Sequence, residues 1–322
     1  MYINSPAWQE GIRPGDKLIS VSAADDSTIF TADAGTDAVV SALNSGEYNT
    51  LELLHNGSDA TYLAEKTSSA FKLSSMLLAT NSSAWAFLGS GDDFALKESA
   101  EDAYADLPDG TGYLRVDCLE EGILYQVPEI AAKFNELGLD TLIIDLRYEA
   151  AVSSSAMQAF AGCFPQLAGK LILSTGNYVD TQDLNAFAYD AEHSFPEDTK
   201  VYVMAGNYTN CVDSCFIGAL VCYGVMDYSD VYMSVYSDEY CEERGIENNG
   251  SVYDVGVSIG VYYNPVTGST LELQTGVFTW VNNRSTEENP LGIADGCTAV
   301  DAPFVTNGYN EELAQLLADI AE

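Results

Sequence analysis

A predicted helix over residues 211–223 begins with side chains that could act as nucleophiles. Cys211 stands at its start, and Ser214 follows within the first turn. A thiol at a helix N-terminus ionises more easily than an ordinary thiol, because the helix amides favour the thiolate. One hypothesis for this segment is therefore attack on a carbonyl carbon, with Cys211 or Ser214 as the attacking group.

The same residues also have a structural interpretation, which we favour. Cys211, Cys215 and Cys222 fall on one face of the expected helix, and a buried cysteine packs as a small hydrophobe. A thiol nucleophile benefits from a base, but His55 and His193 are the only histidines. His193 stands in a polar loop, where a solvated side chain is the usual state.

The cysteines show no metal-binding spacing. None of the seven forms a Cys-x-x-Cys pair. The three cysteines of the expected helix lack a fourth ligand at a recognised distance along the chain. We therefore predict no metal site and no cofactor.

The charge of the chain restricts its partners. Lys and Arg number 12 against 49 Asp and Glu, which gives a formal net charge of −37. This field repels nucleic-acid phosphates and anionic lipid head groups, so neither is an expected partner. The sequence has no apolar run of about 18 residues, and residues 1–15 lack the basic and apolar parts of a signal peptide. We expect no membrane insertion by this chain.

Tyrosines and carboxylates are interspersed between Tyr223 and Tyr240. This segment could be a recognition surface for a basic or carbohydrate partner. It could equally be an acidic connection between two strands, and the residues leave both interpretations open.

The first 66 residues predict a small α+β module. A turn at Pro14-Gly15-Asp16 precedes its first strand, and His55-Asn56-Gly57-Ser58 is a hairpin signal. The expected elements are a strand from Leu18, a helix with its apolar face over 38–43 that is closed by Gly46, and strands at 50–54 and 60–64.

From residue 112 the pattern becomes an alternation of strands and helices, which is typical of an α/β domain with a parallel sheet. Residues 67–110 are expected to connect the two parts and to hold one strand. The expected core elements are strands at 113–116, 141–147 and 200–204, helices at 128–138 and 211–223, and a terminal helix at 309–322.

Four motifs occur in the order seen in the C-terminal processing (tail-specific) serine peptidases. They are Gly112-Tyr113-Leu114-Arg115-Val116, Leu142-Ile143-Ile144-Asp145-Leu146-Arg147, Thr209-Asn210-Cys211-Val212-Asp213-Ser214 with Gly218-Ala219-Leu220, and Gly292-Ile293-Ala294-Asp295. The chain therefore resembles this family over nearly its whole length. The resemblance implies a crotonase-like spiral α/β core at 111–308, followed by a C-terminal helix at 309–322.

The N-terminal part resembles the second half of a PDZ domain, so a partial PDZ-like module is expected at 1–66 and a connecting region at 67–110. PDZ domains bind a peptide C-terminus as an added strand. The resemblance makes Gly11, Ile12, Gly15 and Asp16 the candidate peptide-binding residues. The carboxylate-binding loop of a PDZ domain would precede Ser5.

The resemblance also locates departures from a working peptidase. The family has its nucleophilic serine at the position of Cys211. It has its lysine base about two dozen residues later, near Tyr236, but no lysine follows Lys200 in this chain. Tyr236 cannot replace a lysine whose pKa has been lowered to accept the serine proton.

The oxyanion region departs from the family as well. The family has Asn-x-Gly-Gly after Asp-Leu-Arg, where glycine lets backbone amides approach the developing charge. This chain continues with Tyr148, Glu149 and two alanines. The positions implied for oxyanion contact are Ala151, Val152 and Val212.

We therefore expect a catalytically inactive homologue of serine-type peptidases, a pseudoenzyme that binds peptides or protein tails. An active endopeptidase that uses Cys211 or Ser214 is the first alternative. A scaffold protein of the cell envelope is the second. The resemblance implies a location outside the cytoplasm, either secreted or at the cell envelope.

Overall fold

The chain is described here by a computed structural model of its 322 residues. The residues that the structure describes are 5–12, 16–23, 29–31, 38, 41, 48–55, 58–65, 74–99, 102–120, 124–147, 153–174, 188–247, 249–252, 257–263, 270–277, 279–280, 291–302 and 308–321.

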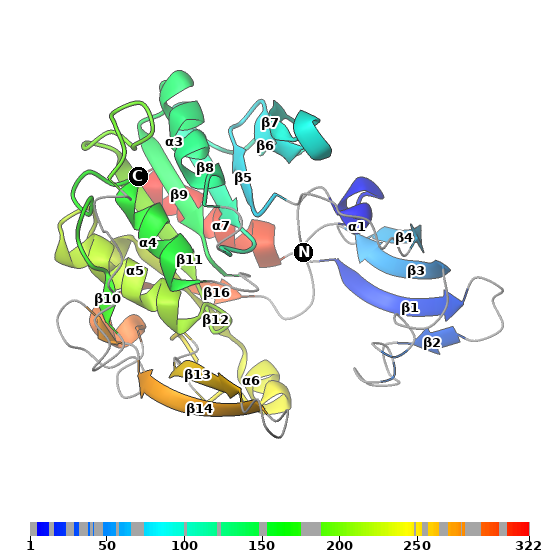
Figure 1. Ribbon diagram of the computed structural model, residues 1–322. Coiled ribbons are helices and arrows are strands. Elements are labelled where there is room, and N and C mark those ends of the chain that lie inside the picture. Colours follow the sequence, from blue (N-terminus) through cyan, green and yellow to red (C-terminus); the bar gives the residue numbers. More distant parts are fainter. Residues whose placement is uncertain are drawn as a thin grey trace.

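An eight-stranded sheet organises the larger part of the molecule (Figure 1). Its order is β16 (Thr298–Ala302), β12 (Val231–Tyr236), β11 (Lys200–Ala205), β9 (Thr141–Asp145), β8 (Thr111–Val116), β5 (Met76–Ala79), β6 (Ala84–Leu88) and β7 (Ala95–Glu98). The five strands from β16 to β8 pair in parallel, and the last three add antiparallel. The predicted α/β fold class is confirmed.

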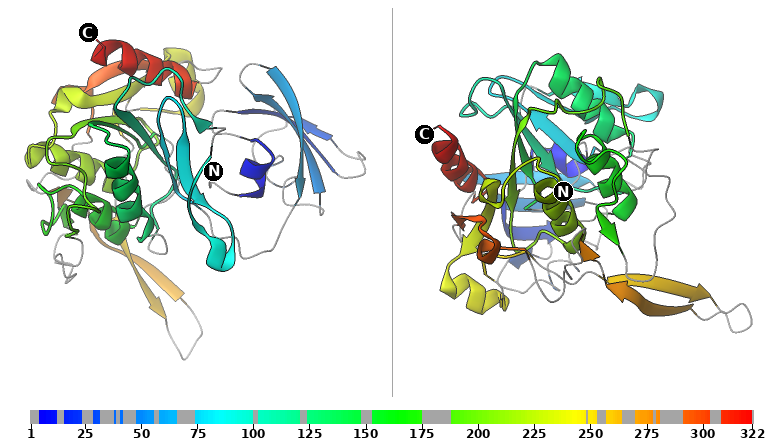
Figure 2. Two further views of the ribbon diagram at one scale, coloured as in Figure 1. Left: turned by 90° about the horizontal axis from the view of Figure 1, so that it is seen from above. Right: turned by 90° about the vertical axis from the view of Figure 1, so that its left-hand side faces the viewer.

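Helices cover both faces of this sheet. One face packs against α3 (Gln126–Glu136), α4 (Ser154–Gly162) and α5 (Cys211–Cys222). The other face packs against α7 (Gly308–Ile320), which lies across the sheet from the other three helices (Figure 2). The molecule is thus a three-layer α/β structure around two buried apolar faces.

The alternation of side chains along a strand explains why both faces are buried. In β8, Leu114 and Val116 belong to the core under α3–α5, whereas Tyr113 belongs to the core under α7. In β9, Leu142 and Ile144 face the first core and Ile143 the second. Strands buried on two sides appear in sequence as continuous apolar runs.

The predicted core elements lie close to their expected positions. Helix α3 begins two residues before Pro128, and Gly138 follows it with φ +65°, a left-handed conformation that suits glycine after a helix end. The terminal helix begins at Gly308, one residue before its predicted start. The predicted hairpin is also present, with His55 paired to Ser58.

The expectation of one strand in 67–110 was wrong. This range contains β5, β6 and β7, which extend the main sheet. All four residues of β5 are buried. Serines and alanines suggested a linker, but short apolar runs gain stability when a sheet edge is available to pair with them.

A second sheet has the order β2-β1-β3-β4, with β1 (Lys17–Ala23), β2 (Ile29–Thr31), β3 (Tyr48–His55) and β4 (Ser58–Glu65). The helix expected over 38–43 and its closing Gly46 lie largely outside the described residues. The boundaries predicted for the PDZ-like module and the connecting region remain predictions.

The N-terminal α1 (Pro6–Gln9) contacts the main sheet through one aromatic side chain. Trp8 is buried and packs in the core under α7 with Leu77 and Ala79. The Arg115 guanidinium lies 5.1 Å from the centre of its ring, and Arg115 pairs with Asp117 at 2.9 Å. The chain before β1 is therefore anchored on the face that α7 covers.

Further described strands and helices are β13 (Val257–Tyr263) and β14 (Thr270–Val277), the pair β10 (Leu173–Ser174) and β15 (Thr279–Trp280), and α6 (Asp238–Arg244). The β13–β14 hairpin projects from the body of the molecule (Figure 2). Within the described part of the chain, no helix is long and apolar enough to cross a membrane.

Candidate functional site

The loop between β11 and α5 carries the predicted nucleophile and is tied to the end of β9. The buried Thr209 hydroxyl accepts the Gly206 amide at 2.9 Å and donates to the Leu146 carbonyl at 3.0 Å. The Leu146 amide in turn donates to the Met204 carbonyl at 2.9 Å. Two of the four motifs that suggested a peptidase fold thus meet at the carboxyl ends of adjacent parallel strands.

Replacing Thr209 by Val is expected to lower the free energy of unfolding by about 1–3 kcal/mol, because the isosteric side chain leaves two buried backbone groups without their partner. Urea unfolding measures this loss. Thr298→Val is the control, since the Thr298 hydroxyl donates at an exposed position where water can replace it. A loss below about 0.5 kcal/mol for Thr209→Val would mean that the loop holds without this tether.

Helix α5 begins with a capping box. The Asn210 side chain accepts the Val212 amide at 2.9 Å and the Asp213 amide at 3.4 Å, while Asp213 accepts the Asn210 amide at 3.1 Å. Such a cap satisfies the first amides of a helix, which have no intrahelical acceptor. Val212 was predicted to contact an oxyanion, but its amide is directed at Asn210.

The nucleophile candidates on α5 are enclosed. Cys211 is 8% exposed, Ser214 is fully buried, and the Ser214 hydroxyl donates to the Asn210 carbonyl at 3.3 Å. Cys211 and Cys215 both belong to the hydrophobic core. The prediction of a three-cysteine buried face was wrong for Cys222, which is exposed because the last residue of α5 extends beyond the core.

Neither histidine is placed by the described contacts as a base for Cys211. His193 lies on a surface loop, and its Nδ1 is 2.7 Å from the Asp190 carboxylate. The Asp190 carboxylate accepts a hydrogen bond from the His193 ring, which raises the pKa of His193 above its ordinary value. His55 ends β3 in the other sheet.

Tyr236, predicted near the lysine position of the family, lies beside the nucleophile loop. A Cβ placed on Gly206 would be 3.4 Å from the Tyr236 hydroxyl and 3.1 Å from the Ser234 hydroxyl. The main chain of Tyr236 is held by Asn249, whose side chain accepts its amide at 2.9 Å and donates to its carbonyl at 2.8 Å. The structure therefore brings the Tyr236 side chain to this loop.

Two tyrosines pack with Tyr236. The Tyr240 ring stacks on it with centroids 4.9 Å apart, and the Tyr208 ring meets it edge-on at 6.5 Å. We call Tyr208, Tyr236 and Tyr240 the tyrosine cluster. Sequence reasoning singled out Tyr236 and the segment to Tyr240, but it missed Tyr208.

Three of the four candidate peptide-binding residues of the PDZ-like part, Gly11, Ile12 and Asp16, lie among the described residues. Gly11 has φ +91°, and its amide donates to the Trp8 carbonyl at 2.9 Å. The Ile12 amide donates to the Ala7 carbonyl at 3.0 Å. Both amides therefore close α1. Asp16 is partly exposed.

Three further candidates, Gly15, Ala151 and Val152, lie outside the described residues. Their predicted roles in peptide binding and oxyanion contact stay predictions.

A buried ionic network lies on the opposite side of the β9 motif from α5, and sequence reasoning missed it. Arg147 holds Asp145 in a two-point contact, Nε to Oδ1 at 3.0 Å and Nη2 to Oδ2 at 2.8 Å. Its Nη1 donates to Glu312 of α7, which also accepts the Ser234 hydroxyl. Tyr113 donates to Asp145 at 2.5 Å. All five side chains are buried.

The network sets the protonation of its members. Burial pushes the pKa of Asp145 upward, but the Arg147 charge and the hydrogen bonds from Arg147 and Tyr113 outweigh it, so this pKa lies below its ordinary value. Burial dominates at Glu312 and raises its pKa. Asp145 and Arg147 are therefore a fixed ion pair and part of the framework.

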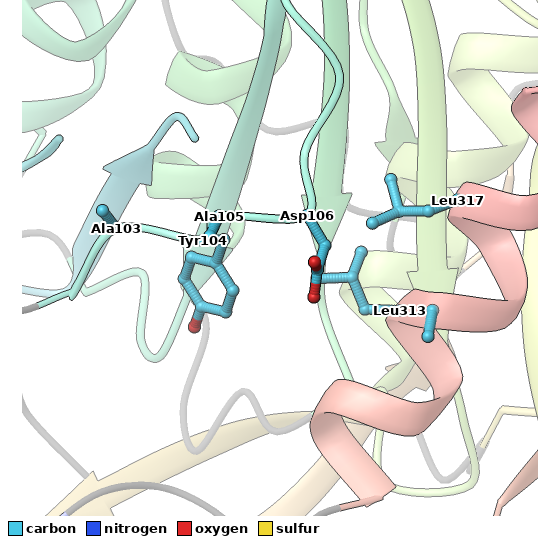
Figure 3. Close-up of a pocket in the computed structure, with 7 residues that line it drawn as sticks. Ala103, Tyr104, Ala105, Asp106, Leu313 and Leu317 are labelled. Carbon is cyan, nitrogen blue, oxygen red and sulfur yellow. The ribbon is translucent and has the colours of Figure 1, made fainter. Parts of the chain in front are cut away.

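Two cavities lined by described residues lie away from the candidate residues. A cavity of about 220 Å³ opens between α7 and the loop that precedes β8 (Figure 3). It is lined by Ala103, Tyr104, Ala105, Asp106, Leu313, Ala314 and Leu317. A second hollow of about 300 Å³ lies by the β5–β6 turn. Among the described residues, no group of three His, Cys, Asp or Glu side chains is arranged to hold a metal ion.

Comparison with known proteins identifies the fold. No family model and no curated protein match the sequence. A solved Bacteroides fragilis protein designated an S41 protease superposes with a TM-score of 0.59 at 13% identity, over 100% of this chain and 77% of that one. The photosystem II D1 C-terminal processing protease aligns with a TM-score of 0.48 at 14% identity, over 98% of this chain and 71% of that one.

The predicted resemblance to the C-terminal processing peptidases is therefore confirmed at the level of the fold.

Proposed function

Since the chain has the fold of the S41 proteases, we propose that it is a catalytically silent relative that binds peptides or unstructured protein tails. One observation carries the first half of this proposal. The Val212 amide, at the position implied for oxyanion contact, donates to the Asn210 side chain at 2.9 Å. An amide held by a helix cap is not aimed at a developing oxyanion, and such donors supply much of the rate in acyl transfer.

The nucleophile position supports the same conclusion. Cys211 replaces the serine of the family and is 8% exposed. No lysine follows Lys200, and Tyr236 lies where the family base is expected. Loss of the family lysine as activating base, or of one oxyanion donor, would each lower the rate by orders of magnitude.

The loop between β11 and α5, which would contact a bound peptide, is nevertheless held in place by hydrogen bonds. The Thr209 hydroxyl ties it to Leu146, just after β9, through one hydrogen bond and accepts the Gly206 amide of the same loop through another. Tyr208, in the same loop, is 45% exposed, which among the aromatic side chains described here is matched by Tyr125. A rigid loop with an exposed aromatic residue is a typical peptide contact.

Cleavage of casein by the purified chain, beside its Cys211→Ala and Ser214→Ala variants, tests the catalytic half. We expect no cleavage by any of the three, with a trace of trypsin as the positive control for detection. Cleavage by the parent chain that disappears in Cys211→Ala would contradict the proposal and establish a cysteine peptidase. Loss only in Ser214→Ala would assign the serine instead.

Fluorescence anisotropy with a labelled, unstructured peptide of zero net charge tests the binding half. Saturable binding is expected. An absence of binding to a set of such peptides would favour the alternative of an envelope scaffold protein.

We also infer a location outside the cytoplasm from the sequence resemblance. Fractionation of the source cells with an antibody against this chain tests it, and recovery only with cytoplasmic markers would contradict it.

A further inference from the structure

We propose that the tyrosine cluster is a subsite for a lysine or arginine side chain of the bound peptide. This inference rests on the proposed peptide-binding function and names the chemistry that the site would select. Tyr208 comes from the nucleophile loop, Tyr236 from the end of β12 and Tyr240 from α6. Three separate elements thus bring aromatic rings to one place beside the loop.

The geometry of the cluster presents ring faces and edges together. Tyr236 and Tyr240 are stacked with an interplanar angle of 25°, and Tyr208 stands at 79° to Tyr236. The Tyr208 and Tyr240 hydroxyls are 3.0 Å apart. This hydrogen bond links Tyr208 to Tyr240, while the edge-on ring contact with Tyr236 places the Tyr208 ring.

The cluster already accepts a cation from its own chain. The Arg244 guanidinium carbon lies 5.6 Å from the centre of the Tyr240 ring. This separation is within the range of about 6 Å over which a cation is attracted by an aromatic ring. Burial and the hydrogen bond with Tyr208 raise the pKa of Tyr240 to about 12, so the ring remains a neutral phenol.

The charges around the cluster select the same class of ligand. Helix α6 begins with Asp238 and Glu239 and continues with Glu242 and Glu243, all of them exposed. The whole chain carries a formal net charge of −37. Carboxylates beside aromatic rings favour a basic side chain over an acidic or neutral one.

The position of the cluster relative to the loop decides which part of a peptide it would contact. Tyr208 precedes Cys211 by three residues, and the Tyr236 hydroxyl lies over Gly206. A peptide that crosses this loop would therefore place one of its side chains at the rings. The general negative field attracts any cation, whereas the rings act only on a side chain held at this point.

Two labelled twelve-residue peptides of the same unstructured sequence test the inference, one with two lysines and one with the same lysines acetylated. Their dissociation constants are measured by anisotropy with the parent chain, Tyr208→Leu and Tyr208→Phe. Tyr208 is 45% exposed, so neither substitution removes a core side chain. The Phe variant keeps the ring face and loses only the hydroxyl.

The lysine peptide is expected to bind the parent chain more tightly. This preference should fall about two- to five-fold in Tyr208→Leu and persist in Tyr208→Phe. An unchanged preference in Tyr208→Leu would overturn the inference and assign the effect to net charge alone. Equal binding of the two peptides by the parent chain would overturn it while leaving the proposed function standing. If neither peptide bound to the parent chain, both the inference and the proposed peptide-binding function would be contradicted.

Discussion

Replacing Arg147 by Met is expected to lower the free energy of unfolding by about 3–5 kcal/mol, because it leaves buried carboxylates without their counter-charge. Arg147 is fully enclosed and holds Asp145 and Glu312. Methionine has a similar length, so the loss comes mainly from the missing charge and hydrogen bonds. Urea unfolding followed by tryptophan fluorescence measures it.

A surface ion pair provides the matched control. Lys97 and Asp93 are 2.8 Å apart, but their side chains are 39% and 83% exposed. Lys97→Met should cost less than about 1 kcal/mol, because water screens the charge that remains. Similar losses for the two variants would contradict the view that the Arg147 network is a buried framework.

The pH dependence gives an independent readout of the same network. In the parent chain the lowered pKa of Asp145 stabilises the folded state at pH values above the ordinary pKa of an aspartate. This stabilisation is lost as the pH falls through the folded-state pKa. Without Arg147, burial would raise the pKa of Asp145, as it already raises that of Glu312. An acid with a raised pKa destabilises the folded state increasingly as the pH rises.

The loss caused by Arg147→Met should therefore be smaller at about pH 4.5 than at about pH 8, because carboxyls with raised pKa values change protonation between these two pH values. Unfolding curves of the parent and the variant at both pH values measure the difference. An equal loss at the two pH values would mean that the carboxyls do not titrate in this range.

Replacing Phe216 by Ala is expected to destabilise the chain by about 3–5 kcal/mol, since it removes a fully buried aromatic side chain and leaves a cavity. Phe216 lies on α5, and its ring stacks on Phe160 with centroids 4.9 Å apart and an interplanar angle of 25°. A second ring, Phe164, lies 5.9 Å away. This contact holds α5 against α4, and with it the start of the helix at the candidate site.

Chemical denaturation of Phe216→Ala beside Cys222→Ala checks this expectation. Cys222 ends the same helix and is exposed, so its substitution should change the stability by less than about 0.5 kcal/mol. If Phe216→Ala also lost less than about 1 kcal/mol, the surrounding rings would have to collapse into the space, which close packing normally prevents.

Local patterns were sufficient for most of the elements. The apolar runs at 113–116, 141–147 and 200–204 became β8, β9 and β11, because a strand buried on both faces needs no polar alternation. The end of α3 at Gly138 was predictable because a glycine after a helix acts on the nearest backbone groups.

Prediction from local patterns failed where pairing with strands distant in sequence decided the secondary structure. Residues 74–99 contain three strands of the main sheet instead of the single strand expected in 67–110. Their composition resembles a linker, but β5 pairs with the edge of β8, and β6 and β7 then add in turn. Pairing of this kind depends on which edge is free and cannot be inferred from the segment alone.

The sequence by itself determined the α/β class, the order of the core motifs, the absence of a lysine after Lys200 and the cysteine at the start of α5. These are properties of residue type and local spacing. Only the tertiary structure decided that Arg147 pairs with Glu312 across 165 residues, that Tyr208 joins Tyr236 and Tyr240, and that the Val212 amide is taken by Asn210. Such contacts follow from the packing of separate elements, which brings side chains together at distances that no periodicity in the sequence encodes.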